Sequence, residues 1–208
     1  MGATKRLAEL VLFTHPETAL QRKAVRLGNV LGSSGSVGPI FLKQIMEGGP
    51  VTVTHRDARR FFLTLDHAVI LLMTALSPEY KTGILIPDLG PAKRVEELAR
   101  YLIAATARER QGIEILFTGL RPGDKVEEHL SAPDERVLAQ ENDLFSIIQS
   151  EQMAATAVHT IVEQISLSVR HRDLRLLLET ICKAVPEYRP GHVLEQAIQS
   201  KRQAELRK

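Results

Sequence analysis

The sequence of 208 residues has one cysteine, Cys182, and no tryptophan. A single thiol excludes an internal disulfide and a cysteine-based metal cluster, and it fits a reducing compartment. The seven histidines show neither a His-x-x-x-His nor a His-Glu-x-x-His spacing, so we expect no metal site. No stretch approaches the ~20 apolar residues that span a bilayer, and no signal peptide is visible. We therefore expect a cytoplasmic protein without a membrane segment.

An excess of charge of one sign is also lacking. The chain carries 27 Lys and Arg against 25 Asp and Glu, and no basic run is interleaved with aromatic residues. Nucleic acid is therefore not an expected partner. The sequence has no Gly-x-Gly-x-x-Gly fingerprint, no Walker lysine after a glycine loop and no Gly-x-Ser-x-Gly frame of a serine hydrolase. What it does have is an apolar fraction of 44%, which is enough for a core.

The most informative stretch runs from Arg26 to Phe41. An apolar run over residues 24–31 has the length and β-branched content of a buried strand. It leads into a glycine and serine loop, residues 32–38, after which Pro39 opens an apolar helical pattern. In α/β proteins such an arrangement receives anions, because the loop amides and the positive end of the helix point outward. The alternative is a flexible connector.

Elsewhere the hydrophobic pattern predicts alternating helices and strands, and so an α/β protein with a mostly parallel sheet. We expect helices over residues 2–14, 39–47, 67–76 and 95–107, with Asp66 as an N-cap, and strands over 51–54, 83–87 and 114–117. Residues 151–208 are expected to be largely helical. Their candidate packing positions are Ile161, Ile165, Leu174, Leu177, Leu178 and Ile181.

Arginines occur in two predicted turns. Arg59 and Arg60 lie in the charged turn 55–60, and Arg121 lies in the Pro-Gly turn 119–125. Guanidinium groups bind phosphate oxygens through paired hydrogen bonds, so these residues suit a nucleotide diphosphate together with Asn29 and the glycine loop. The alternative for each arginine is a solvated side chain or one paired with a carboxylate. The residues alone therefore indicate an α/β protein with a phosphate-binding loop.

Five motifs extend this interpretation. They are MGATKRLAE (1–9), RLGNVLGSSGSV (26–37), GPVTVTH (49–55), FTGLRPGDK (117–125) and VPEYRP (185–190). In this order they closely resemble the C-terminal half of the polysaccharide-biosynthesis nucleotide-sugar dehydratases. These are CapD-like UDP-N-acetylglucosamine 4,6-dehydratases of the extended short-chain dehydrogenase/reductase family.

The resemblance implies a fold and a division of the chain. Residues 1–50 would be the last elements of a Rossmann domain, 51–150 a small α/β substrate-binding region and 151–208 a helical extension. The Rossmann fold would be incomplete, because the family's dinucleotide-binding loop and first strands are expected before Met1. We therefore expect a fragment that binds a UDP-sugar and is inactive alone, whereas the complete family enzyme uses NAD or NADP.

The resemblance also implies site residues. Lys5 matches the catalytic lysine of the family's Tyr-x-x-x-Lys element, which binds the nicotinamide ribose, and Met1 stands at the tyrosine position. A thioether cannot transfer a proton, so another group would have to act there. The nicotinamide end of the cofactor is expected against residues 30–34, and the UDP-sugar against Asn29, Val37, Arg60 and Arg121. The cofactor-lining residues are Val30, Leu31, Gly32, Ser33 and Ser34.

Three functions stay open at this point. The first is the UDP-sugar-binding half of a 4,6-dehydratase, which predicts stabilisation by UDP that is lost on Arg121→Ala. The second is a non-catalytic subunit that forms a homo-oligomer or pairs with a separate N-terminal Rossmann half. It predicts an exposed apolar surface where the further strands would pack. The third is a UDP-sugar epimerase or reductase.

Overall fold

The fold is described from a computed structural model of the chain, which describes residues 2–14, 20–106, 112–132, 135–138, 144–149, 153–191, 194 and 196. Two compact units can be distinguished. One holds residues 23–150, and the other combines residues 1–22 with residues 151–208. The predicted functional division into residues 1–50, 51–150 and 151–208 stays a prediction.

Helices form where the hydrophobic pattern has a helical period. The helices predicted over residues 2–14 and 95–107 are confirmed, and those predicted over 39–47 and 67–76 begin two residues earlier than expected. None of the described helices is both long and apolar enough to cross a membrane. The helices are α1 (Gly2–Thr14), α2 (Val37–Met46), α3 (Leu65–Ala75), α4 (Val95–Thr106), α5 (Ala155–His171) and α6 (Leu174–Ala184).

The strands are short, and the predictions for them are confirmed only in part. Those predicted over residues 51–54, 83–87 and 114–117 are present, whereas the strand over residues 145–149 was not expected. The strands are β1 (Lys23–Val25), β2 (Asn29–Val30), β3 (Val51–Val53), β4 (Arg59–Arg60), β5 (Phe62–Leu63), β6 (Gly83–Pro87), β7 (Lys93–Arg94), β8 (Ile115–Phe117), β9 (Arg136–Leu138) and β10 (Phe145–Gln149).

The prediction of one strand over residues 24–31 is wrong, because the chain changes partner within that run. Val25 pairs with Leu85 of β6, whereas Asn29 pairs with Phe62 of β5. The change occurs at Gly28, where a Cβ atom would lie 2.8 Å from the Cβ of Phe61. Glycine therefore permits the close approach that turns one apolar run into β1 and β2.

The largest sheet has the strand order β1-β6-β10-β9. β1 is parallel to β6, but β10 is antiparallel to both β6 and β9. The pairs β2–β5 and β3–β8 are parallel, and β4–β7 is antiparallel. The largest sheet is therefore mixed, and its antiparallel strand β10 is the main departure from the expected parallel arrangement.

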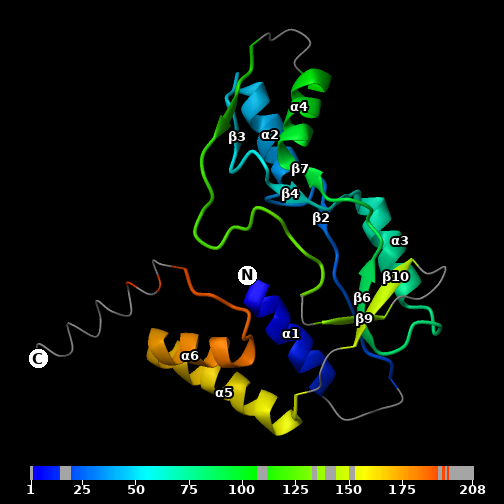
Figure 1. The fold of residues 1–208 in the computed structure, drawn as a ribbon, viewed down its shortest axis with the longest axis vertical. Helices are drawn as coiled ribbons and strands as arrows, with labels where there is room; N and C mark the ends of the chain where they lie inside the picture. The colour runs from blue at the N-terminus through cyan, green and yellow to red at the C-terminus, as the bar shows by residue number, and fades with distance from the viewer. Residues whose placement is uncertain are drawn as a thin grey trace, which may run out of the picture. The chain divides into compact units, whose positions relative to one another are not determined.

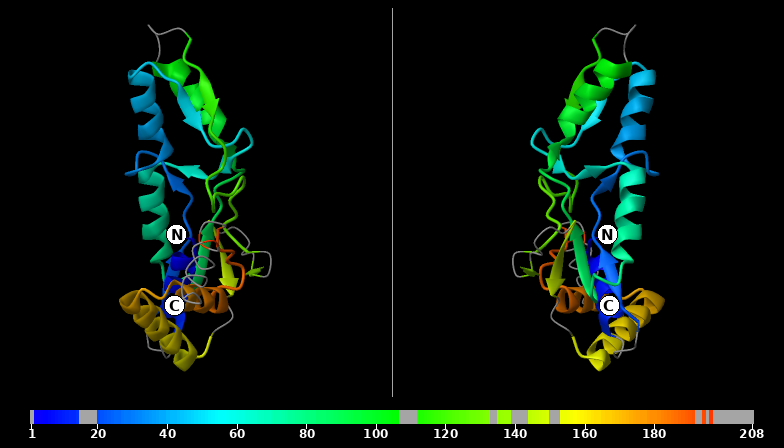
Figure 2. Two further views of the ribbon diagram at one scale, coloured as in Figure 1. Left: turned by 90° about the vertical axis from the view of Figure 1, so that its left-hand side faces the viewer. Right: turned by 90° about the vertical axis from the view of Figure 1, so that its right-hand side faces the viewer.

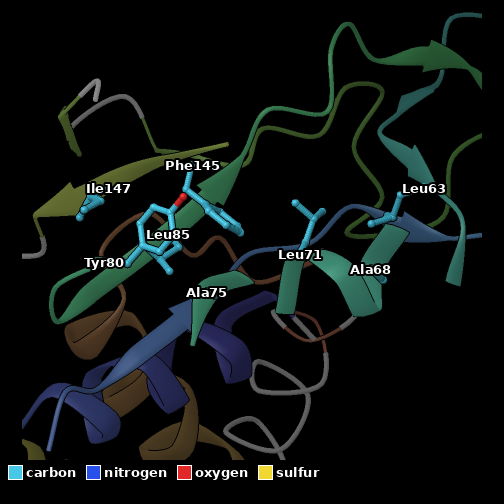
Figure 3. Close-up of a cluster of buried hydrophobic side chains, with 8 residues drawn as sticks. All are labelled: Leu63, Ala68, Leu71, Ala75, Tyr80, Leu85, Phe145 and Ile147. Carbon is cyan, nitrogen blue, oxygen red and sulfur yellow. The ribbon is translucent and has the colours of Figure 1, made fainter. Parts of the chain in front are cut away.

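Helix α3 covers this sheet through a buried cluster (Figure 3). Ala68, Leu71 and Ala75, spaced three and four residues apart, form the buried face of the helix. On the sheet side, the rings of Tyr80 and Phe145 meet edge to face with centroids 5.2 Å apart. The N-cap of α3 is Thr64, whose hydroxyl accepts from the His67 amide at 3.2 Å. The prediction that Asp66 is the cap is therefore wrong.

A second core lies where α2 and α4 pack against each other and against β3 (Figures 1 and 2). Val51 and Val53 are buried, as are Phe41 and Ile45 of α2. Partly buried residues of β8 complete the cluster. This core fixes the start of α2, and so the end of the glycine loop.

In the other unit, α5 and α6 pack against each other as a helical hairpin. Arg172, the C-cap of α5, has a left-handed φ of 52° at the turn between them. Of the predicted packing positions, Ile161 and Leu178 are buried. Ile165 packs on the cluster around Ile161, Ala184 and Val185. Leu174, Leu177 and Ile181 are only half-buried. The prediction of helical structure after residue 151 is confirmed for the described residues.

Candidate functional site

The glycine loop lies between β2 and α2, and its own hydrogen bonds shape it. The Leu31 amide donates to the Leu63 carbonyl at 2.8 Å, and the Ser36 amide donates to the Ser33 carbonyl at 3.0 Å. The Ser33 hydroxyl donates to the Val30 carbonyl at 2.8 Å. Gly32 and Gly35 adopt φ values of 78° and 74°, which suit glycine. The loop is therefore a defined turn rather than an open connector.

The loop leads directly into α2. Ser36 is the N-cap, but its hydroxyl makes no capping bond, and its oxygen is buried without a partner among the described residues. Residues 32–35 are exposed. Val37, a predicted UDP-sugar contact, is the first helical residue and packs on the second core. The amides of the first turn of α2 thus have no side-chain cap, which is the arrangement that favours an anion.

Asn29 and Arg60 are brought close together. The Asn29 amide donates to the Phe61 carbonyl at 2.6 Å, and Arg60 immediately precedes Phe61. Both residues are half-buried. Asn29 lies in β2 and Arg60 in β4, and Phe61, which follows Arg60, accepts the bond from Asn29. Two of the predicted UDP-sugar contacts are therefore linked through Phe61 at the beginning of the glycine loop.

The guanidinium of Arg60 contacts the chain that follows Arg121. Its Nη1 donates to the carbonyl of Val126 at 3.1 Å and its Nη2 to that of Lys125 at 2.9 Å. Its Nε lies 3.0 Å from Oε1 of Glu128. The side chain is only 15% exposed. Arg60 therefore links the Asn29 strand to residues 125–128.

Arg121 lies in a braced turn. Its amide donates to Oδ2 of Asp124 at 3.1 Å, and the Asp124 amide donates back to the Arg121 carbonyl at 2.9 Å. Gly123 has a φ of 89°. The side chain of Arg121 is exposed, and its guanidinium contacts no acceptor among the described residues. It is available to an anionic ligand.

Lys5 belongs to the other unit. It is an exposed residue of α1, and Met1 lies outside the described residues. The proposed cofactor role of Lys5 and the consequence of methionine at position 1 therefore stay predictions. Within the described part of the chain, no group of three or more His, Cys, Asp or Glu side chains could hold a metal ion.

An ion pair near the site was not foreseen from the sequence. Arg26 binds both carboxylate oxygens of Glu135 at 2.7 Å, and both side chains are largely buried. The available signal was the position of Arg26 inside an apolar run, because a buried arginine requires a partner. The identity of that partner, 109 residues away, carried no local signal.

Comparison with known proteins finds similarity over most of the chain. A family model described as "Polysaccharide biosynthesis protein" matches residues 1–150. The capsular polysaccharide biosynthesis protein CapD of Staphylococcus aureus is 42% identical over 137 residues, which are 65% of this chain and 23% of CapD. The probable polysaccharide biosynthesis protein EpsC of Bacillus subtilis is 43% identical over 136 residues, with the same two shares.

Two further similarities extend the comparison. A UDP-glucose 4-epimerase of Rickettsia bellii is 31% identical over 150 residues, which are 68% of this chain and 41% of the epimerase. Among solved structures, the X-ray structure of Pen from Bacillus thuringiensis matches with a TM-score of 0.58 and 26% identity. The match covers 76% of this chain and 55% of Pen. The chain thus spans less than a quarter of CapD and EpsC, and less than half of the epimerase.

Proposed function

The chain belongs to the polysaccharide biosynthesis protein family, and from this membership we propose that it binds the UDP part of a UDP-N-acetylglucosamine-type nucleotide sugar. It would do so as the substrate-binding part of a 4,6-dehydratase. The observation that carries the proposal is Arg121, an exposed and uncommitted guanidinium on a turn that Arg60 ties to the Asn29 strand. A guanidinium of this kind binds a diphosphate through two parallel hydrogen bonds.

The chain's own residues suggest the pose of the ligand. Arg121 would hold diphosphate oxygens, and Arg60 retains one Nη2 hydrogen for the same group. Asn29 would donate its side-chain amide to the sugar, and Val37 would contact the uridine. The uncapped first turn of α2 adds favourable partial positive charge.

The residues present fit one end of a dinucleotide. Gly32, Ser33 and Ser34 are exposed, and Gly32 has a positive φ, so a nicotinamide ribose can approach the loop backbone closely. Val30 and Leu31 would line the apolar side of the nicotinamide. Lys5 lies in the other unit, and its role in binding the ribose hydroxyls stays a prediction. NAD or NADP, when bound, supplies the hydride acceptor of the reaction. The residues of this chain would orient the sugar against that acceptor.

The test is a thermal-shift titration with UDP-N-acetylglucosamine, with and without NAD or NADP. At ~100 times its dissociation constant the ligand should stabilise the fold by about 2.7 kcal/mol. We expect the shift to vanish in Arg121→Ala and to persist in Arg170→Ala, which removes an exposed arginine of α5. A wild-type chain that shifts with neither ligand would refute the proposal. A larger shift with UDP-glucose would favour an epimerase, in keeping with the Rickettsia relatives.

A second function, that of a subunit acting through an interface, is favoured by α3. Leu65, Val69, Leu72, Met73 and the C-cap residue Leu76 follow a helical spacing and share one face. Each is between 45% and 71% exposed. In addition, β1 is a parallel strand at the edge of its sheet, a position that parallel sheets normally cover. Both features suit a further parallel α/β layer from another chain or segment.

Light scattering on the chain alone tests this second function. The exposed stripe on α3 should make the wild type self-associate, and Val69→Asp with Met73→Asp should shift it toward the monomer without lowering its melting temperature. The matched control is Val162→Asp with Val169→Asp, two exposed apolar residues of α5. A wild type that is monomeric at high concentration would count against the interface.

A further inference from the structure

The described residues 125–132 and Glu135 have little regular structure of their own, yet contacts with other parts of the chain fix them at two places. Near their start, the amide of Arg59 donates to the Val126 carbonyl at 2.8 Å, and the backbones of Arg59 and Glu127 form an isolated parallel β-bridge. Near their end, the Ala132 amide donates to Oε2 of Glu135 at 2.7 Å. An arginine side chain acts at each place. The described part of the segment between the Arg121 turn and β9 is therefore held by the guanidinium groups of Arg26 and Arg60 together with the backbone of Arg59.

At the first place, nearly all the N–H groups of the Arg60 guanidinium already have acceptors in the protein. A guanidinium carries five N–H groups. Nε faces Glu128, Nη2 donates to Lys125, and Nη1 donates to the carbonyls of Arg59 at 2.7 Å and Val126 at 3.1 Å. Four of the five N–H groups are thus directed at protein acceptors within 3.1 Å. Arg60 has little capacity left for a ligand, and its main contacts are with backbone carbonyls.

At the second place, Arg26 makes a bidentate pair. Nη1 and Nη2 each donate to one oxygen of Glu135 at 2.7 Å, and Nη1 also donates to the Leu130 carbonyl at 2.9 Å. The backbone of Arg26 is itself fixed, because its amide donates to the Leu85 carbonyl at 2.9 Å. Arg26 stands three residues before Asn29. Arg26 lies in the connection between β1 and β2, and it therefore joins the chain that leads into Asn29 to the segment that follows Arg121.

We propose that Arg26 and Arg60 are positioning residues for nucleotide binding, which hold residues 125–130 and Glu135 so that the Arg121 turn faces the Asn29 strand. The proposal rests on the proposed function of Arg121. It assigns the main diphosphate contact to Arg121, leaves Arg60 a single N–H for the ligand, and assigns the orientation of the Arg121 turn to Arg26 and Arg60. The bidentate geometry matters, because a lysine would keep the charge but could not hold two acceptors in one plane.

The test uses Arg26→Lys and Glu135→Gln in the full chain, since both variants keep a polar partner in a largely buried place and should fold. First, trypsin cleavage between Lys125 and Val126, followed by mass spectrometry, reports the hold on the segment without any ligand. We expect faster cleavage in both variants at a temperature at which each remains folded. The control is Arg100→Lys, which alters a two-nitrogen pair with Glu96 on α4. Cleavage at the wild-type rate would overturn the proposal.

Second, calorimetry with UDP measures the consequence for binding. Arg26→Lys should weaken affinity about tenfold, which corresponds to the loss of one charge-assisted hydrogen bond to the diphosphate. In an Arg121→Lys background the same substitution should have less than about a twofold effect, because Arg26 acts through Arg121. An equal loss in both backgrounds would contradict the positioning role. A wild type that does not bind UDP would refute the proposed function, while the cleavage rates would still decide whether the segment is held.

Discussion

Gly28 shows how a single residue position determines the geometry of the candidate site. It lies between two strands that belong to different sheets, and its backbone lies directly against Phe61. The next residue, Asn29, bonds to the Phe61 carbonyl. Any side chain at position 28 would push the chain before Asn29 away from Phe61. The position of Asn29 relative to Arg60 therefore depends on the absence of a Cβ atom.

We predict that Gly28→Ala destabilises the fold by about 1–3 kcal/mol, because the added methyl group meets backbone atoms that cannot rotate away. Far-UV circular dichroism during urea unfolding measures this, and it suits a chain without tryptophan. The control is Gly38→Ala in α2, where a Cβ meets nothing within 4 Å. There we expect a change of no more than about 1 kcal/mol, with alanine favoured. Equal effects at both positions would contradict the steric argument.

At the scale of elements, the N-terminus of α3 offers two candidate capping residues, Thr64 and Asp66. Thr64 has an extended backbone and accepts from His67, whereas Asp66 lies inside the first turn. An acidic residue in the first turn interacts only with the helix dipole.

Thr64→Ala should therefore cost about 1 kcal/mol, and Asp66→Ala roughly half of that. Chemical unfolding of both variants gives the comparison. High salt should reduce the effect of Asp66→Ala but leave that of Thr64→Ala, since the dipole interaction is screened and the hydrogen bond is not. A larger loss for Asp66→Ala would restore the sequence-based assignment of the cap.

Elements also show which features the sequence could predict. The helices were predicted within about two residues at most ends, because an amphipathic period is a local property. The partners of β1 and β2 were not, because Val25 and Asn29 belong to one apolar run and differ only in what they pair with. The strand β10 was missed for the same reason, since its register is set by β6, about 60 residues earlier.

In the candidate site, too, local features could be predicted from the sequence and long-range contacts could not. Asn29, the glycine loop and Arg121 were identified from residue type and spacing. The saturation of Arg60 was not, because its acceptors are backbone carbonyls, which have no signature in a sequence. The partner of Arg26 was also invisible, since a carboxylate 109 residues away is one of many.

At the scale of the whole molecule, the two units have separate cores, and a substitution in one should leave the other intact. Leu178 on α6 is buried, at 6% exposed, whereas Leu176, two residues earlier on the same helix, is 36% exposed.

We predict that Leu178→Ala destabilises the helical unit by about 2–5 kcal/mol, through lost burial and a residual cavity. Hydrogen exchange followed by mass spectrometry should then show faster exchange in α5 and α6 and an unchanged rate in β6. Leu176→Ala is the control and should alter exchange little. Faster exchange in both units would mean that the chain unfolds as one cooperative body.

The strand order within residues 23–150 has a consequence for how this protein can be rebuilt. The chain enters this unit at Lys23, opposite Gly83, and leaves it after Ile148, opposite Ile84. Both ends of the unit therefore lie beside the first residues of β6, on either side of it, roughly 10 Å apart by the usual strand spacing. Residues 23–150 thus have the geometry of an inserted cassette, which could be excised, closed with a short linker or reopened elsewhere.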